Sequence, residues 1–201
     1  MKKSILTLAI AIASLVGINS TSSAATHDRD AVTTIKEITR INKIEVRGNV
    51  ELYLSDGTSD QVKVYNNYYS ESALVQNQNG VLKISSYKTE KLVLWITVTD
   101  LRNLSVYDNA HVKSFGKLSA IDLDVKLYND ASAQLNLDAY AVSMKVNDHA
   151  KADIAGTINE AELTYDYCAF LNVSNLSSTH LVKKVNLDYP GKTEKNLVVE
   201  L

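Results

Sequence analysis

The sequence predicts an all-β protein folded as a right-handed parallel β-helix (solenoid), with coils of roughly 19–21 residues and capping strands at both ends. Apolar and polar residues alternate along most of the chain, which is the period of half-buried strands. One such alternating run occurs four times in residues 101–176 and leads each time to an alanine. These alanines, spaced 21, 19 and 19 residues apart, are Ala110, Ala131, Ala150 and Ala169. The spacing leaves no room for a helix in each coil.

Residues 1–24 are predicted to be a signal peptide. Lys2 and Lys3 form a basic start, and Ile5 to Ile18 is mainly apolar. Small residues at Ser22-Ser23-Ala24-Ala25 favour cleavage after Ala24 or Ala25. The apolar run is shorter than the roughly 20 residues that cross a bilayer as a helix, so no transmembrane segment is expected in the mature chain. We expect export to the periplasm, the cell surface or the extracellular space.

The composition predicts one disulfide-free domain over residues 41–201, preceded by a polar leader at 25–40. Cys168 is the only cysteine, so no internal disulfide can form, and it is expected to be a small buried core residue. The first 24 residues hold two of the 21 basic residues and none of the 23 acidic ones, which leaves the mature chain a net charge of −4. Without a basic cluster, nucleic acid is not an expected partner.

Strands are expected from Ile41 onward. Period-two alternation predicts strands at 44–46, 50–54, 62–64, 81–84 and 92–98. Residues 66–79 are irregular and could hold one or two helical turns. Val93 and Trp95 make the strand at 92–98 apolar on both faces, which predicts that both faces are covered. The strands from Ile41 to Val98 would cap one end of the stack. Residues 181–187 and 197–199, joined by the Tyr189-Pro190-Gly191 turn, would cap the other.

The four alternating runs are expected to stack about 4.8 Å apart. Stacking would fill the interior with columns of apolar side chains. One column is Leu104, Val125, Met144 and Leu163, and the other is Val106, Leu127, Val146 and Tyr165.

The order of several segments resembles a known family. The segments are GNVELYLSDG, QVKVYNN, NGVLKI and TVTDLRNLSV, followed by polar and small residues at regularly spaced corners. From about Ile41 to about Leu187 the chain resembles the bacterial domain family described as "putative auto-transporter adhesin, head GIN domain", common in exported proteins of Bacteroidetes. Members usually carry a Gly-Ser-Gly type of corner where this chain has, for example, Asp108-Asn109-Ala110. The resemblance implies a right-handed β-helix, an exported location and a role in adhesion.

Stacking would also bring polar residues together at one edge. The candidate ligand-binding residues are Tyr107, Asp108, Tyr128, Asn129, Asp130, Asp148 and His149. They could bind a sugar or a cation. Asp108 and Asp148 would be roughly 9–10 Å apart, at the limit of what carboxylate-assisted glycoside hydrolysis requires. The structural interpretation is that Asp and Asn occupy bends because their side chains bind nearby backbone groups.

Tyrosine is enriched, with eleven residues against one tryptophan and two phenylalanines. Tyr53, Tyr65, Tyr107, Tyr128 and Tyr140 are among the candidates for an exposed aromatic face, which would suit contact with a glycan or a protein. Alternatively, these tyrosines are strand formers that tolerate half-buried sites.

The sequence holds no catalytic, cofactor-binding or metal-binding motif, so no catalytic residue, cofactor or metal is predicted. We therefore expect an exported binding or adhesion module whose partner is a glycan or a cell-surface protein, and not an enzyme. Two alternatives stay open. One is a β-helix enzyme that acts on a polysaccharide, and the other is an architectural envelope protein without a ligand.

Overall fold

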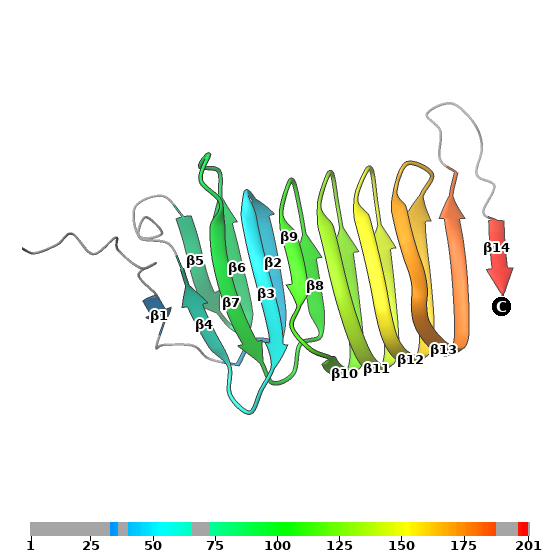
Figure 1. Cartoon of the computed structure of the whole chain (residues 1–201), viewed down its shortest axis with the longest axis horizontal. Coiled ribbons are helices and arrows are strands. Elements are labelled where there is room, and N and C mark those ends of the chain that lie inside the picture. Colours follow the sequence, from blue (N-terminus) through cyan, green and yellow to red (C-terminus); the bar gives the residue numbers. More distant parts are fainter. Residues whose placement is uncertain (1–32, 36–39, 66–72, 188–196, 201) are drawn as a thin grey trace, which may run out of the picture.

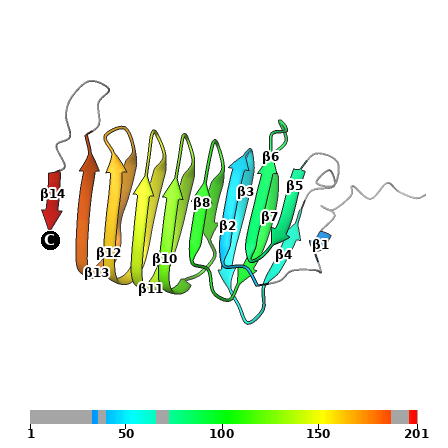
Figure 2. The ribbon, with the colours of Figure 1, turned by 180° about the vertical axis from the view of Figure 1, so that it is seen from behind.

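The structure is a computed structural model that describes residues 33–35, 40–65, 73–187 and 197–200, which form one 14-stranded β-sheet (Figures 1 and 2). The strands are β1 (Thr33–Ile35), β2 (Lys43–Gly48), β3 (Val50–Asp56), β4 (Gln61–Val64), β5 (Ala73–Gln78), β6 (Val81–Ser86), β7 (Leu92–Val98), β8 (Asn103–Val106), β9 (His111–Ser114), β10 (Leu118–Leu127), β11 (Ser132–Val146), β12 (Lys151–Asp166), β13 (Phe170–Asn186) and β14 (Leu197–Glu200).

The sheet curls until its two halves face each other. Its strand order is β1-β4-β7-β3-β9-β11-β10-β8-β2-β6-β5, with β12, β13 and β14 following β11. This path runs along one half to β11 and returns along the other, so that β2 and β3, consecutive in the chain, lie in opposite halves. The long strands β11 to β13 bend and contribute to both halves (Figure 1).

The all-β class is confirmed, but the predicted parallel β-helix is wrong, because the sheet is a mixed, strongly curled half-barrel. Antiparallel pairs occur at both of its ends: β1–β4, β4–β7 and β5–β6 at one, and β13–β14 at the other. Alternation of apolar residues has the same period in parallel and antiparallel strands, so it could not reveal these pairs. The Asn79-Gly80 turn, with φ of 51° and 80°, is a two-residue hairpin loop and cannot join parallel strands.

The predicted cap from Ile41 to Val98 is instead largely part of the sheet. Strand β2 lies between β6 and β8, and β3 lies between β7 and β9, all in parallel. An early segment is thus inserted between two later ones. After β7 the chain runs alongside the residue before β2. There the backbone N–H groups of Arg102 and Asn103 donate to the carbonyl of Asn42 at 2.9 and 3.0 Å.

Several other expectations fall at the margins of the sheet. The helical turns expected within 66–79 are wrong for the described part, because Ala73–Gln78 forms β5. Thr33–Ile35, inside the expected leader, forms β1 and pairs with β4. The predicted signal peptide and the turn at 189–191 lie outside the described residues. Within the described part of the chain, no helix has the length and apolar character that membrane crossing requires.

The core lies between the two halves of the sheet. Leu104, Val125, Met144 and Leu163 are register partners on successive strands, as are Val106, Leu127, Val146 and Tyr165, so both predicted columns are confirmed. All but Tyr165 are at most 1% exposed. Alternate positions of β2, β3, β6 and β7 extend the same core. The two outer faces of the sheet and its edges remain for contact with other molecules.

Candidate ligand-binding surfaces

Four tight turns lie side by side where β8, β10, β11 and β12 end, and they hold all the candidate ligand-binding residues predicted from the sequence. We call this the turn edge: residues 107–110, 128–131, 147–150 and 166–169. In each turn the alanine N–H donates to the carbonyl three residues earlier, at 3.0 to 3.2 Å. Ala110, Ala131 and Ala150 are fully buried, which explains why a small side chain ends each turn.

The polar residues of the turn edge meet a backbone requirement. Asp108, Asn129 and Asp148 have φ of 60°, 59° and 58°. This left-handed conformation is unfavourable for most L-residues, and Asp and Asn tolerate it better than others. The residue types that suggested a ligand site are therefore also the types that these turns favour.

The same side chains form a ladder of hydrogen bonds from one turn to the next. Asp108 Oδ2 accepts the N–H of Gly48 at 3.1 Å, and Asn129 Oδ1 accepts the N–H of Asp108 at 3.4 Å. Asp148 Oδ2 accepts the N–H of Asn129 at 2.8 Å. The N–H of Asp148 donates in turn to Asp166 Oδ2 at 2.8 Å. One oxygen of each carboxylate or amide in this ladder is thus engaged by the protein backbone.

Tyr107 and Tyr128 are brought together as a stacked pair, with ring centroids 4.9 Å apart and an interplanar angle of 5°. The guanidinium of Arg47 lies 3.8 Å from the centroid of Tyr107. Because β2 and β10 flank β8, Arg47 and Tyr128 cover opposite ring faces of Tyr107. A ligand could therefore reach the edge of this ring but not its faces.

Asp130 and His149 are exposed at the tips of their turns. Among the described residues, no hydrogen bond or ion pair joins their side chains. Cys168 is also exposed, so the expectation that it is a buried core residue is wrong. It lies in the last turn, where the position before the alanine points away from the core, as in the three preceding turns.

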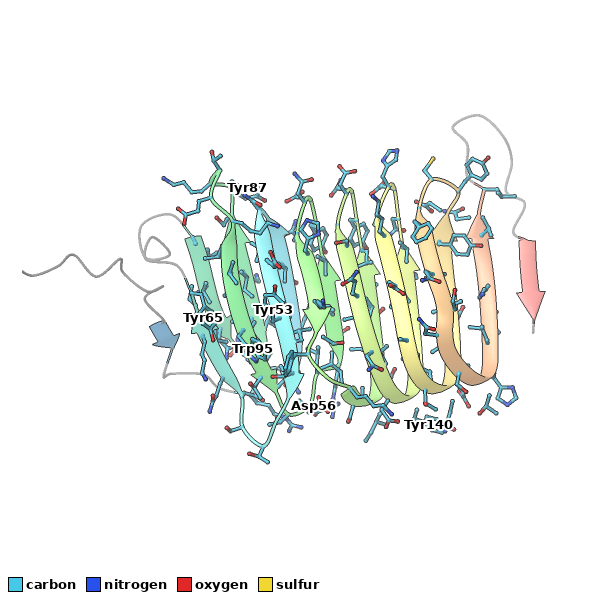
Figure 3. All side chains as sticks on the ribbon, in the orientation of Figure 1. Tyr53, Asp56, Tyr65, Tyr87, Trp95 and Tyr140 are labelled. Atoms are coloured by element: carbon cyan, nitrogen blue, oxygen red, sulfur yellow. The ribbon has the colours of Figure 1, made fainter. Side chains whose placement is uncertain are left out.

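A second surface, on the outer face of β3 and β7, was only partly visible in the sequence. We call Tyr53, Trp95 and Phe115 the aromatic cluster. Tyr53 and Trp95 are cross-strand partners with ring centroids 5.8 Å apart, and Phe115 lies 4.8 Å from Trp95. Figure 3 shows Tyr53 and Trp95 on neighbouring strands, with Tyr140 in another part of the molecule. Phe115 is 64% exposed, although Tyr53 and Trp95 are half-buried.

Hydrogen bonds hold the aromatic cluster in place. The indole N–H of Trp95 donates to Ser55 Oγ at 3.0 Å, and the hydroxyl of Tyr53 donates to Glu51 Oε1 at 2.6 Å. The sequence signal was the apolar pair Val93 and Trp95 on the outer face of a strand. Among the described residues, side chains of the neighbouring strands cover that face and no second layer does, so the cluster stays partly open to solvent.

A shallow hollow of about 270 Å³ adjoins the aromatic cluster. We call it the polar hollow; its polar lining is Glu51, Tyr53, Lys91, His111, Lys113, Ser132 and Gln134. Lys91 Nζ lies 3.3 Å from Glu51 Oε2, and His111 Nδ1 is hydrogen-bonded to Ser132 Oγ. The hydrogen bond from Tyr53, together with Lys91, lowers the pKa of Glu51. Burial and the nearby Lys91 lower the pKa of His111, which favours its neutral form.

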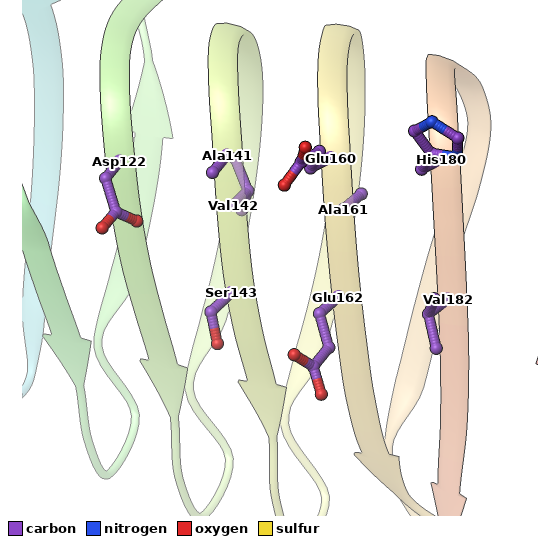
Figure 4. A pocket seen from close by; sticks show the side chains of 9 residues that line it. All are labelled: Asp122, Ala141, Val142, Ser143, Glu160, Ala161, Glu162, His180 and Val182. Carbon is purple, nitrogen blue, oxygen red and sulfur yellow. The ribbon is translucent and has the colours of Figure 1, made fainter.

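A second hollow, of about 350 Å³, lies over β10 to β13 and is acidic (Figure 4). Asp122, Glu160 and Glu162 line it together with His180. Glu162 binds Lys184 at 2.6 Å, and Glu160 accepts the hydroxyl of Tyr140 at 3.3 Å. Across the part of the chain that the structure describes, no three acidic, histidine or cysteine side chains converge as a metal site would require.

These features define the class of protein: an all-β protein with a curled sheet and a partly exposed aromatic cluster on one outer face. The sequence profile of the family "putative auto-transporter adhesin, head GIN domain" matches residues 40–188. The chain therefore belongs to this family, as its sequence segments suggested. No curated protein has a significant sequence match to it.

Solved structures share the fold at low sequence identity. One is described as a putative adhesin from Bacteroides fragilis, with 17% identity, a TM-score of 0.66 and coverage of 78% of this chain and 77% of that one. Another, described as a putative adhesin from Parabacteroides distasonis, has 15% identity, a TM-score of 0.58 and 77% coverage of both chains. A third, described as a putative lipid binding protein from the same species, has 9% identity, a TM-score of 0.57, and 77% and 78% coverage.

Proposed function

We propose that this protein is an exported binding module of the bacterial envelope that adheres to a glycan or a cell-surface protein and catalyses no reaction. The aromatic cluster is the observation that carries the proposal. An exposed phenylalanine packed on a tryptophan is costly to leave in water, and such exposed apolar groups commonly mark contact sites. Family membership and the signal peptide predicted at 1–24 support export.

The strands and hydrogen bonds that hold the aromatic cluster in place favour binding. Tyr53 and Trp95 stand on paired central strands, and each has its polar atom engaged by a neighbouring side chain. Side chains that are already ordered lose little conformational entropy when a partner arrives, so more of the contact energy appears as affinity. The ladder on the turn edge, in contrast, serves the backbone. Because Asp130 and His149 are exposed there, the turn edge stays a second candidate contact surface.

The test measures binding of the fluorescently labelled purified protein to an array of glycans and cell-surface proteins. Phe115→Ser is compared with the wild type, and Ile121→Ser is the matched control, because Ile121 is 83% exposed and lies outside the aromatic cluster. We expect Phe115→Ser to weaken binding by about fivefold or more and Ile121→Ser to leave it unchanged. Equal binding by all three proteins would contradict the proposal. Loss on His149→Ser but not on Phe115→Ser would contradict the assignment to the aromatic cluster.

A further inference from the structure

The polar hollow and the aromatic cluster form one continuous surface. Tyr53 belongs to both, since it stacks on Trp95 on the β7 side and lines the hollow on the β9 side. Lys113 is the direct cross-strand partner of Tyr53, and Gln134 is the partner of Lys113 on the next strand. A ligand that touches the ring of Tyr53 is therefore within reach of an ammonium group and an amide.

The charge balance of the hollow favours an anion. Glu51 is the one acidic side chain in its lining, and both Lys91 and the Tyr53 hydroxyl already bind it. Lys113 makes no ion pair among the described residues, and neither does the exposed Lys151, whose strand neighbour Ser132 lines the hollow. Asp153, the strand partner of Gln134, is the acidic residue placed on the rim in the same way. With Glu51 and Asp153 set against Lys91, Lys113 and Lys151, the hollow and its rim keep one excess positive charge.

The remaining groups indicate what else the ligand carries. Ser132, Gln134 and His111 offer neutral hydrogen-bonding groups, which suit hydroxyls. Tyr53 and Phe115 offer apolar surface, which suits the C–H face of a sugar ring. A hollow of about 270 Å³ is at the lower limit of small-molecule sites and has room for a single ring. The open sheet surface around the hollow allows a longer chain to continue past that ring.

We propose that the polar hollow binds an acidic sugar unit of a polysaccharide, with the sugar carboxylate on Lys113 and the ring against Tyr53. The proposal rests on the binding function above and names its ligand class. A carboxylate on Lys113 forms a charge-assisted hydrogen bond, which is stronger than one between neutral groups. The same unit with its carboxylate masked keeps the ring and the hydroxyls but loses this bond.

Binding can be followed by the fluorescence of Trp95, because it is the chain's one tryptophan and lies beside the site. Its fluorescence is recorded while the purified protein is titrated with a galacturonate trisaccharide and, separately, with the methyl ester of that trisaccharide. Lys113→Gln is compared with Lys145→Gln, an exposed lysine on the other half of the sheet. We expect the acid to bind at least tenfold more tightly than its ester. Lys113→Gln should abolish this preference, and Lys145→Gln should keep it.

Three results of the titrations would overturn the proposal. They are equal affinity for acid and ester, an unchanged preference in Lys113→Gln, and no binding of galacturonate, guluronate or sialyllactose probes. Competition by inorganic phosphate as strong as that by the acidic sugar would also overturn it, since the hollow would then recognise an anion without its ring. In each case the Phe115→Ser comparison on the array decides separately whether the binding function stands.

Discussion

Asp148 shows how one residue type can suggest a ligand site while serving the backbone. Its φ of 58° places it in the left-handed region, and its carboxylate accepts the N–H of Asn129 at 2.8 Å. Asparagine keeps both properties, because it tolerates this conformation and has an acceptor oxygen in the same place. Alanine keeps neither.

We therefore expect Asp148→Ala to reduce the free energy of unfolding by about 1–3 kcal/mol and Asp148→Asn to reduce it by less than about 1 kcal/mol. Chemical denaturation of the three proteins measures both changes. If Asp148→Asn is as damaging as Asp148→Ala, the negative charge itself matters, and a ligand role for this carboxylate would gain support.

At the scale of the element, β12 depends on a glycine in the middle of a strand. Gly156 has φ of 106°, and a Cβ at this position would lie 2.0 Å from the carbonyl oxygen of Leu137 on β11. The register between β12 and β13 also shifts just before it, between Asp153 and Ala155. The close approach of two backbones explains why glycine occurs inside a sheet here.

The matched variant is Gly116→Ala, because Gly116 has φ of 79° but no atom within 4 Å of an added Cβ. We expect Gly116→Ala to cost about 1 kcal/mol from its backbone conformation alone. Gly156→Ala should cost about 2–4 kcal/mol, since β11 must also move. Equal losses of unfolding free energy in the two variants, measured by denaturation, would show that β11 moves without cost and that its contact with Gly156 does not constrain this position.

Prediction from the sequence succeeded where a residue's role depends on its near neighbours in the chain. Alternation identified the interior columns, and the regular spacing of the four alanines marked the ends of the turns. The aromatic cluster was predicted only in part: Tyr53 was a candidate for an exposed aromatic face, but its contact with Trp95 depends on the pairing of two strands in which these residues are 42 positions apart. Pairing of distant strands depends on the whole fold, and a period-two pattern does not contain it.

At the scale of the whole molecule, the same limit explains the error in the fold. The insertion of β2 and β3 between later strands depends on how the segment after β7 crosses the sheet, where Asp100 binds both Arg40 and Arg102. No local pattern marks such a crossing. The antiparallel pair β5–β6 follows from its two-residue connection, whereas β1–β4 and β4–β7 pair strands that are far apart in the chain. The alternation of side chains records neither arrangement.

The arrangement of strands makes stability uneven along the molecule. Strands β11 and β12 are paired along both edges and carry fully buried side chains such as Leu137 and Ile154. Strand β5 pairs on one side with β6 and has no fully buried position. Local opening is easiest where few apolar contacts and few shared hydrogen bonds must be broken.

We expect amide hydrogens in β11 and β12 to exchange with solvent at least tenfold more slowly than those in β5. Hydrogen exchange of the native protein, followed by mass spectrometry of its peptides, measures this difference. The aromatic cluster stands on β3 and β7, which are also paired on both sides, so their amides should exchange slowly like those of β11. Fast exchange in β3 and β7 would show that the cluster is not held rigidly, and it would remove the entropic argument for binding there.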